Sequence, residues 1–242
     1  STQRSARCFA IDGVVGLGGG SVMDVAKVLA AVATDGRNVR SLAGSNKVGS
    51  RRLPVVMLPT TAGTGSEATP VAVFTNEDSG GKVGVVDPRL VPDAAIIDPA
   101  LTDSLPRGTT AAAGIDALIH AIEAFIAGVA TPLARGLALE AARHIGPALP
   151  AVCRNPVDRA ARDAMAIGSN LAGVAFANSS CCAVHALALP VGGRFHIPHG
   201  VLTGGLAAAV MKRNAPACAA DFAALAQALG WDTAPAAFAP RL

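Results

Sequence analysis

The residues best suited to chemistry in this chain are an aspartate and several histidines in its second half. Asp116 and His120 are four positions apart in the segment AAAGIDALIHAIEAF at residues 111–125. On a helix both side chains would lie on one face, one turn apart. The residues between them are apolar, and a buried carboxylate beside a buried imidazole is costly unless something pairs with both. A divalent metal ion would do this, although a direct Asp–His hydrogen bond would also explain this pair.

Two further histidines lie in apolar surroundings downstream. His185 lies within residues 164–193, which contain no Asp, Glu, Lys or Arg, and His199 lies in HIPHG at residues 196–200, a turn into the next expected helix. A single histidine on an apolar helix is more often a core residue than a ligand. One carboxylate with three imidazoles, however, suits Fe(II), Zn(II), Mn(II) or Co(II), with room for a substrate oxygen. The candidate ligands are Asp116, His120, His185 and His199.

A glycine-rich turn near the start of the chain could bind phosphate. The sequence GGGS at residues 18–21 lies between an apolar strand expected at 13–17 and a helix expected at 22–33. Glycines let the backbone approach a ligand closely, and the N-terminus of a helix offers N–H groups and a positive dipole end to an anion. The spacing is not GxGxxG, so a plain tight turn is the alternative.

A second polar turn follows another expected strand, at residues 53–58. The sequence PTTAGTGSE at residues 59–67 gathers hydroxyl side chains and two glycines in a short loop. Two such loops at the carboxyl ends of strands would form a nucleotide-binding crevice. Some of these hydroxyls could instead cap a helix near Glu67.

The expected secondary structure differs between the two parts of the chain, with strands and helices in the first and helices alone in the second. Further strands are expected at 71–74 and 82–86, as a hairpin around 76–80, and at 94–97. We predict an α/β domain with a largely parallel sheet over residues 1–105, a boundary near 103–108, and an all-helical domain over residues 106–242. The helices expected in the second domain are 109–127, 132–151, 158–177, 180–189, 200–213 and 219–229.

The composition narrows the classes of function. Apolar residues make up 51% of the 242 residues and charged residues 15%, and the formal net charge is only +3. There is no basic stripe for nucleic acid and no signal-peptide pattern at the start. Polar residues within 164–193 favour helices buried in protein over a membrane span. Five cysteines without a CxxC pair favour reduced thiols in a cytoplasmic enzyme, and Cys181 and Cys182 read as small buried residues on a helix.

These motifs together resemble the iron-containing (group III) alcohol dehydrogenase family. The resemblance implies a dehydroquinate synthase-like architecture, in which a Rossmann-like dinucleotide-binding domain precedes an all-α metal-binding domain. It also implies further chain on both sides in the full-length protein. The segments that carry it are GGGSVMDVAK at 18–27, LPTTAGTGSEAT at 58–69, IIDP at 96–99, AAAGIDALIHAIEAF at 111–125 and VHALALPVGGRFHIPHG at 184–200.

The resemblance implies hydride transfer between NAD or NADP and a small alcohol or carbonyl compound, in a homodimer. The composition leads us to expect neither a nucleic-acid nor a membrane partner. The metal, Fe(II) or else Zn(II), would be held by the four ligands named above. The cofactor would be bound by Gly18, Gly19, Gly20, Ser21, Asp24, Thr60, Thr61, Thr64, Ser66 and Lys82.

Departures from the family pattern affect the proton path. Leu189 stands where many members have a further histidine close to the substrate, so water, a ribose hydroxyl or His196 would take that role. The candidate catalytic residues are therefore His199 and His196. An apolar pocket for a small alcohol is expected at Phe125, Phe176, Leu189 and Phe195.

Three alternative functions remain open from the sequence. Maleylacetate reductase has the same architecture, but its His-x-x-Cys-His pattern is missing after Val184. A hydroxyacid–oxoacid transhydrogenase is a second relative. A non-catalytic module that binds nucleotide or metal belongs to a different class.

Overall fold

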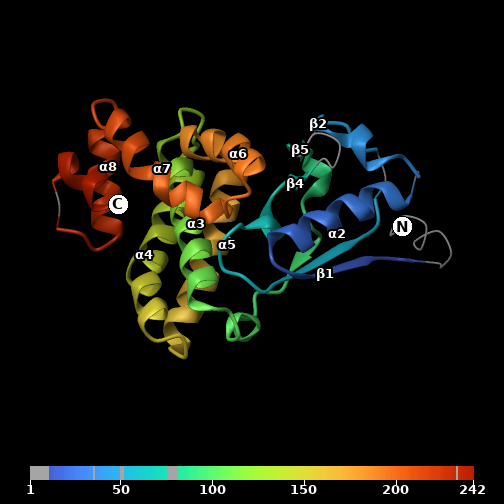
Figure 1. Ribbon diagram of the computed structural model, residues 1–242, viewed down its shortest axis with the longest axis horizontal. Helices are drawn as coiled ribbons and strands as arrows, with labels where there is room; N and C mark the ends of the chain where they lie inside the picture. Colours follow the sequence, from blue (N-terminus) through green and yellow to red (C-terminus); the bar gives the residue numbers. More distant parts are fainter. Residues whose placement is uncertain (1–10, 35, 50–51, 76–80, 233) are drawn as a thin grey trace. The chain divides into compact units, whose positions relative to one another are not determined.

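The computed structural model describes residues 11–34, 36–49, 52–75, 81–232 and 234–242 (Figure 1). It divides into two compact units. The first consists of residues up to Thr60 together with Ser66–Asp98, and the second of Thr61–Gly65 together with Pro99–Leu242.

The division lies at Asp98–Pro99, ahead of the boundary expected near residues 103–108. The segment after Asp98 forms a 3-10 helix, η4 (Pro99–Thr102), which contacts helix α5 of the second unit. Arg162 of α5 is only 3% exposed, and its guanidinium donates to Thr102 Oγ1 at 3.2 Å and to the backbone oxygen of Asp103 at 3.4 Å. A buried guanidinium needs such acceptors, so these turns pack with the helices.

The first unit contains the expected parallel sheet. Strands β1 (Val14–Gly18), β3 (Val55–Pro59) and β6 (Ala94–Ala95) lie in the order β1-β3-β6, and both pairs are parallel. The last strand is shorter than the expected 94–97. The nitrogen of Ile96 still donates to Met57 O at 2.8 Å, but strand pairing ends at Ala95.

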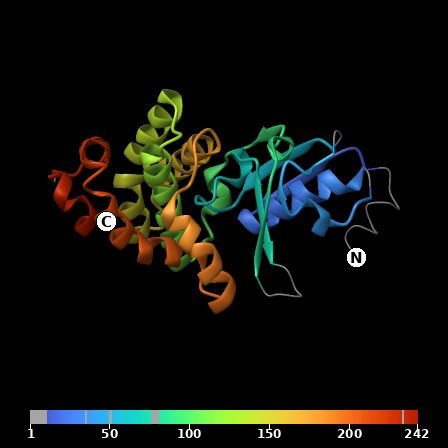
Figure 2. The same ribbon diagram turned by 90° about the horizontal axis from the view of Figure 1, so that it is seen from above.

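A second, mixed sheet completes the β structure described in this unit. Strands β4 (Val71–Thr75) and β5 (Lys82–Val86) form the expected antiparallel hairpin (Figure 2), and residues 76–80 lie outside the described residues. The short strand β2 (Gly44–Ser45), which was not expected, pairs with β5 in parallel.

Helix α2 (Gly20–Ala33) packs against both sheets. Met23 and Ala30 join the core of the first sheet, and Val28 and Val32 join that of the second. Because two faces of α2 are buried, its turns are fixed relative to the strand that precedes it. Three short 3-10 helices complete the unit: η1 (Val39–Leu42), η2 (Ser66–Ala68) and η3 (Pro88–Leu90).

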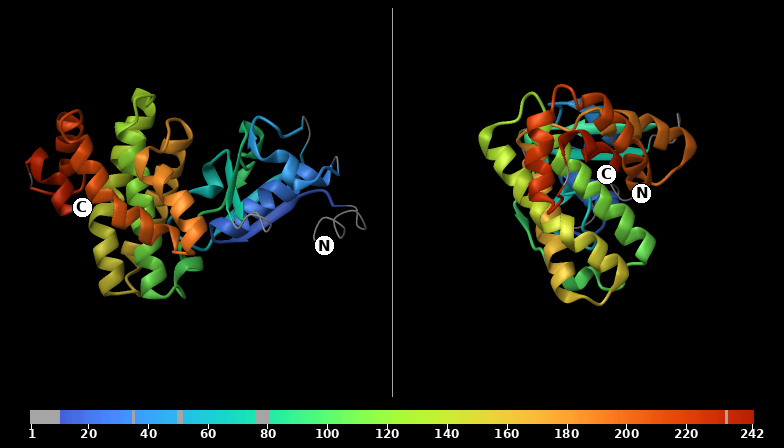
Figure 3. Two further views of the ribbon diagram at one scale, coloured as in Figure 1. Left: turned by 45° about the horizontal axis from the view of Figure 1, so that its top comes forward. Right: turned by 90° about the vertical axis from the view of Figure 1, so that its left-hand side faces the viewer.

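The secondary structure described in the second unit consists of helices, joined by turns and by the separate segment Thr61–Gly65 (Figure 3). Helix α3 contacts α4, α5 and α7, and every one of its residues from Asp116 to Phe125 is buried. This burial makes α3 the core of the unit. The helices are α3 (Arg107–Ile126), α4 (Pro132–Arg154), α5 (Arg159–Ala177), α6 (Ala183–Phe195), α7 (His199–Asn214), α8 (Ala219–Ala228) and α9 (Phe238–Arg241), with η5 (Pro235–Ala237) before α9.

The uncharged stretch at 164–193 does not form one long helix, because it is shared between α5 and α6 and interrupted at residues 178–182. Within the described residues, α3 is the one helix long and apolar enough to cross a membrane by length and composition. Of its apolar window, 61% is buried inside the protein, as in a core helix.

Candidate metal centre

Helix α3 presents three polar side chains on one buried face. Asp116, His120 and Glu123 are spaced by four and then three residues, which places them on successive turns of the same face. They are 3%, 5% and 0% exposed. The structure therefore brings a third polar side chain, Glu123, to the face on which only two were expected.

Asp116 lies among the three predicted histidine ligands. Its Oδ1 is 3.5 Å from Nε2 of His185 on α6 and 3.5 Å from Nε2 of His199 at the start of α7. Its Oδ2 is 4.0 Å from Nδ1 of His120. Thr203 on α7 donates to Oδ1 at 3.1 Å, which holds the carboxylate in place. The four predicted ligands thus come together from three helices.

The donor atoms of this cluster fit a metal ion. Among the described residues, His120 Nδ1 and His185 Nε2 are buried side-chain atoms without a hydrogen-bond partner. A buried polar atom without a partner is destabilising, and an ion beside Asp116 would remove that cost for both nitrogens. The His199 side chain is 38% exposed, so the centre is open to solvent on its side.

The electrostatics of the cluster favour a neutral His120 and an ionised Asp116. Burial outweighs attraction from Asp116 and lowers the pKa of His120 to about 4, and repulsion from His185 and His199 acts in the same direction as burial. Burial alone would raise the pKa of Asp116, but the histidines outweigh it and lower that pKa to about 2. At neutral pH His120 can therefore offer a lone pair, and Asp116 can offer a negative charge.

His185 behaves differently because it lies between two carboxylates. Burial lowers its pKa, but the nearby Asp116, Cys181 and Glu123 outweigh burial and raise it to about 12. His185 therefore carries a proton on Nε2 when no ion is present. A metal ion must displace that proton, so binding weakens as the pH falls.

Glu123 positions His185, and it is the functional residue that sequence reasoning missed. Its Oε2 lies 2.6 Å from Nδ1 of His185, while Oε1 accepts from the nitrogen of Val184 at 2.7 Å. Its Oε2 also accepts from the nitrogen of Cys182 at 2.9 Å. The contact between Nδ1 and Glu123 leaves Nε2 facing Asp116. Metal-binding histidines are commonly oriented in this way by a carboxylate that binds their other ring nitrogen. The spacing of seven residues from Asp116 was the available signal.

The same contacts correct the expected helix at 180–189. Cys181 and Cys182 precede α6, which begins at Ala183 and continues through Pro190 to Phe195. The first N–H groups of a helix need acceptors, and the Cys182 side chain makes no capping hydrogen bond. The carboxylate of Glu123 replaces that cap, so a tertiary contact sets where α6 begins.

Of the other residues expected near the substrate, one contacts the ligand cluster and the rest are buried elsewhere or exposed. Phe176 stacks on the His120 ring, with ring centroids 4.6 Å apart. Phe125 is 3% exposed in the helical core, with the Arg135 guanidinium 3.9 Å from its ring centroid, so it does not line an open pocket. Leu189 and Phe195 are 37% and 61% exposed. His196 is exposed at the end of α6 in the left-handed conformation, with φ 54°, outside the ligand cluster.

The expected phosphate-binding turn lies at the N-terminus of α2. A side chain at Gly18 would place its Cβ 2.6 Å from Cβ of Val22, so only glycine fits. Gly19 is the N-cap and Ser21 is exposed in the first turn. The nitrogen of Thr60 donates to Gly18 O at 2.9 Å, which joins the two polar turns. Because the N-cap residue is a glycine, no side chain caps the first N–H groups of α2, which begins at Gly20.

Three residues expected to bind the cofactor have hydrogen-bond partners within the protein. Ser66 Oγ donates to Asp24 Oδ1 at 2.6 Å, and the nitrogen of Val73 donates to Asp24 Oδ2 at 2.9 Å. The exposed Lys82 Nζ donates to Thr75 Oγ1 across the hairpin at 2.9 Å. Asp24 and Ser66 therefore hold α2, η2 and β4 together. Thr61 and Thr64 lie partly buried in the segment Thr61–Gly65 of the second unit.

Lys27 is a buried cation that sequence reasoning left without a role. Its side chain is 0% exposed, and Nζ donates to Thr69 O at 3.0 Å, to Thr69 Oγ1 at 3.2 Å and to Val71 O at 2.8 Å. Burial lowers its pKa to about 8 despite attraction from Asp24 and Glu67. Lys27 thus fastens α2 to the segment that enters β4.

Both halves of the chain match models of one protein family. Residues 2–99 match the model described as iron-containing alcohol dehydrogenase, and residues 110–239 match the C-terminal model of the Fe-containing alcohol dehydrogenase family. The chain belongs to the iron-containing alcohol dehydrogenase family. The metal cluster and the glycine turn thus lie in the parts that match the C-terminal and N-terminal models, respectively.

Individual members of the iron-containing alcohol dehydrogenase family are similar along most of this chain. Long-chain-alcohol dehydrogenase 1 of Geobacillus thermodenitrificans is 43% identical over 95% of the chain and 59% of its own length. NAD-dependent methanol dehydrogenase of Bacillus methanolicus is 41% identical over 90% of the chain and 58% of its own length. The solved structure of sulfoacetaldehyde reductase from Bifidobacterium kashiwanohense in complex with NAD+ has a TM-score of 0.91 at 33% identity, over 99% of this chain and 64% of that one. The chain thus spans about three fifths of the length of these relatives.

Proposed function

We propose that the full-length protein is a metal-dependent oxidoreductase that transfers a hydride between a nicotinamide cofactor and an alcohol, aldehyde or ketone. The convergence of Asp116 with three histidines, two of which have buried nitrogens without partners, carries this proposal. The matched relatives named as alcohol and methanol dehydrogenases support the same reaction class.

The four proposed ligands have different roles in the metal centre. Asp116 supplies negative charge that offsets the charge of a divalent cation, and His120 and His185 supply buried nitrogen donors. A bound ion would act as a Lewis acid toward the substrate oxygen. His199, which is 38% exposed, marks the side from which substrate would enter. Phe176, stacked on His120, keeps water from that ring.

NAD or NADP is the proposed cofactor. The glycine turn before α2 offers backbone N–H groups to a pyrophosphate, where the positive end of the helix dipole attracts anions. Asp24 and Ser66 would act by shaping this turn, since their side chains bind each other. The residues proposed to contact the cofactor are Gly18, Gly19, Gly20, Ser21, Thr60, Thr61, Thr64 and Lys82.

The side chain of Leu189 cannot carry a proton between substrate and solvent. We propose that the substrate proton leaves through water, a ribose hydroxyl of the cofactor or the exposed His196. Turnover of His196→Gln distinguishes these routes, since a large loss of turnover with metal binding intact would assign the step to His196.

The decisive experiment joins metal analysis to a cofactor screen. Full-length protein is reconstituted with Fe(II) or Zn(II) and assayed for NAD and NADP reduction with a panel of alcohols, with maleylacetate and 2-oxoacids in the reverse direction. His185→Ala should lose the ion and the activity. His144→Ala is the matched control, because His144 pairs with Glu140 on α4 at 3.4 Å and belongs to neither group of possible metal ligands among the described residues. Absence of a bound ion after reconstitution, with unchanged turnover in His185→Ala, would contradict the proposal and favour a non-catalytic module.

We also propose a cytoplasmic homodimer that acts on small molecules rather than on nucleic acid or membrane. The thiols of Cys153, Cys181, Cys182 and Cys218 are free, as in a reducing compartment. Light scattering coupled to size-exclusion chromatography of the full-length protein measures the assembly, and a monomeric mass would contradict it.

A further inference from the structure

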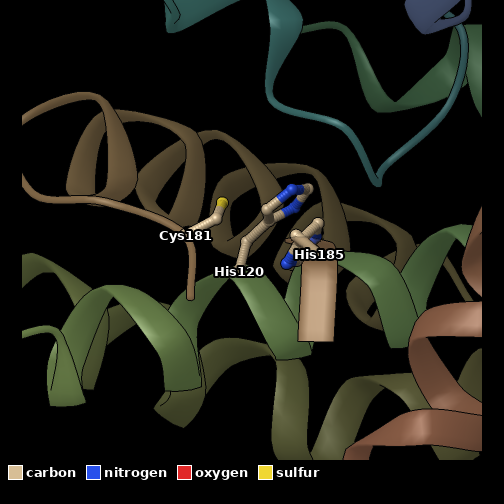
Figure 4. A group of neighbouring side chains, drawn as sticks. All are labelled: His120, Cys181 and His185. Atoms are coloured by element: carbon tan, nitrogen blue, oxygen red, sulfur yellow. The ribbon is translucent and has the colours of Figure 1, made fainter. Parts of the chain in front are cut away.

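A thiol lies beside the metal cluster. The sulfur of Cys181 and one ring nitrogen each of His120 and His185 lie within 4.8 Å of one another (Figure 4). Asp116, His185 and His199 form a second group that meets the same limit. The two groups share His185, so the centre contains two overlapping sets of possible ligands.

We propose that Cys181 is a further ligand of this centre, and that His120, Cys181 and His185 form a thiolate-containing set that holds Zn(II). The inference rests on the proposed function, because it assigns a second binding mode to the same metal centre.

The chemistry of the donor atoms separates the two sets. Thiolate with imidazole is a typical ligand set for Zn(II), whereas a carboxylate with imidazoles also suits Fe(II) and Mn(II). Tetrahedral Zn(II), with Zn–S of about 2.3 Å and Zn–N of about 2.0 Å, needs ligand atoms about 3.5 Å apart. The three ligand atoms lie within 4.8 Å of one another, so a bound ion would draw them closer together.

Each of the two histidines of the thiolate set has a buried nitrogen that could bind an ion. Nδ1 of His120 and Nε2 of His185 are buried without hydrogen-bond partners, in side chains only 7% and 8% exposed. Cys181 is half-buried just before α6, so its sulfur reaches the cluster from a segment outside the helix. Binding replaces the S–H bond of Cys181 by a sulfur–zinc bond and the Nε2–H bond of His185 by a nitrogen–zinc bond, and both protons pass to solvent.

The neighbouring thiol does not share this placement. The sulfur of Cys182 lies 3.7 Å from the backbone oxygen of Glu123, and the backbone nitrogen of Cys182 is bound by the Glu123 carboxylate. Cys182 is absent from the two groups of possible ligands found among the described residues. It is therefore a matched control one residue away.

Because both ligand sets use His185, they cannot each hold an ion at the same time. His185 has two ring nitrogens, and Nδ1 is committed to Glu123 at 2.6 Å. Only Nε2 remains for a metal ion, so an ion held through Cys181 and another held through Asp116 cannot both use His185. Zinc in the thiolate set would therefore compete with iron in the carboxylate set.

The test uses metal-free full-length protein as wild type, Cys181→Ala and Cys182→Ala. Each is loaded with Co(II), which reports a bound thiolate by a sulfur-to-cobalt charge-transfer band in the near ultraviolet. We expect the band in wild type and in Cys182→Ala, and its loss in Cys181→Ala. Zinc affinity, measured against a chromophoric chelator, should fall by at least about tenfold in Cys181→Ala alone. Thermal unfolding of the metal-free variants checks that each is folded.

The outcomes separate this inference from the proposed function. A wild type without the cobalt band, or an unchanged band in Cys181→Ala, overturns the role of Cys181, even if Fe(II)-dependent alcohol oxidation is intact. Failure of wild type to bind any divalent ion, together with absence of NAD or NADP reduction, overturns the proposed function and this inference with it.

Discussion

The carboxylate of Glu123 lies 2.6 Å from Nδ1 of His185 and also accepts hydrogen bonds from the backbone nitrogens of Val184 and Cys182. One side chain from α3 therefore orients a metal ligand and caps the helix that carries it. A carboxylate at the N-terminus of a helix is stabilised by the helix dipole as well as by these hydrogen bonds. Burial raises the pKa of Glu123, but His185 and the backbone donors outweigh burial and lower it.

Replacing Glu123 by Gln should weaken metal binding. The amide keeps the size of the side chain but points N–H donors at backbone N–H groups, so His185 loses its fixed orientation. We expect affinity for the divalent ion to fall about 10- to 100-fold, as for other partners of metal-binding histidines. Titration against a chromophoric chelator measures it. Glu140→Gln on α4, where the side chain is 48% exposed, is the control. Equal affinities in the two variants would show that His185 is held by other contacts.

Removal of the metal should destabilise the helical unit. An ion at about 100 times its dissociation constant stabilises the folded state by about 2.7 kcal/mol. For a protein of this size, that corresponds to a fall in Tm of about 5–10 °C on adding a chelator. Calorimetry with and without chelator measures the shift. In His185→Ala, the chelator should lower Tm only slightly. A full shift in Tm in that variant would place the stabilising ion elsewhere.

Gly200→Ala should disturb both packing and metal binding. A Cβ at Gly200 would lie 2.0 Å from the backbone oxygen of Ala112 on α3, so α7 must move away. His199 is the adjacent residue and would move with it. We expect a loss of about 1–3 kcal/mol in the free energy of unfolding and a lower metal affinity.

Gly205→Ala is the matched control on the same helix. Nothing lies within 4 Å of a Cβ at that position. Alanine in a helix interior is favoured over glycine by about 0.5–1 kcal/mol, so this variant should be slightly more stable. Denaturant unfolding compares the two, and equal stabilities would contradict the close contact of α7 with α3.

Lys27 should give the first unit a stability that rises with pH. Its pKa is about 8 in the folded protein against 10.5 as the ordinary value. Between these values the unfolded chain binds more protons than the folded one, so the free energy of unfolding increases from pH 8 to 10.5. Denaturant unfolding across this window measures the contribution.

Lys27→Met should remove that rise and lower stability at neutral pH. The acceptors Thr69 O and Val71 O lose their buried donor, at a cost of about 1–3 kcal/mol for each group left without a partner. Lys82→Met is the control, because Lys82 is exposed. An identical pH slope in Lys27→Met and wild type would assign the effect to another group.

Much of the fold was predictable because the period and type of apolar residues follow the elements closely. The strand at 13–17 and the hairpin of 71–74 with 82–86 appear as β1, β4 and β5, within one residue at each end. The start of α6 was not predictable. It depends on Glu123, which is more than fifty positions away in the sequence, so local preference placed the helix several residues too early.

The candidate ligands were predictable because Asp116 and His120 share a helix face and His185 and His199 lie in distinctive motifs. The directions of side chains in loops were not. Ser66 and Asp24 both looked suited to a cofactor, yet their side chains bind each other. Cys181 looked like a small residue on a helix, because composition alone cannot show that it lies before α6 and beside His120.

The cap that Glu123 provides also bears on the kinetics of metal exchange. His185 cannot swing away from the centre without releasing the hydrogen bond that ties it to Glu123 and so to the first turn of α6. His199 lies on the partly exposed side, at the start of α7. An ion would therefore be exchanged through His199, while His185 acts as the slow ligand whose departure requires local opening of a helix end.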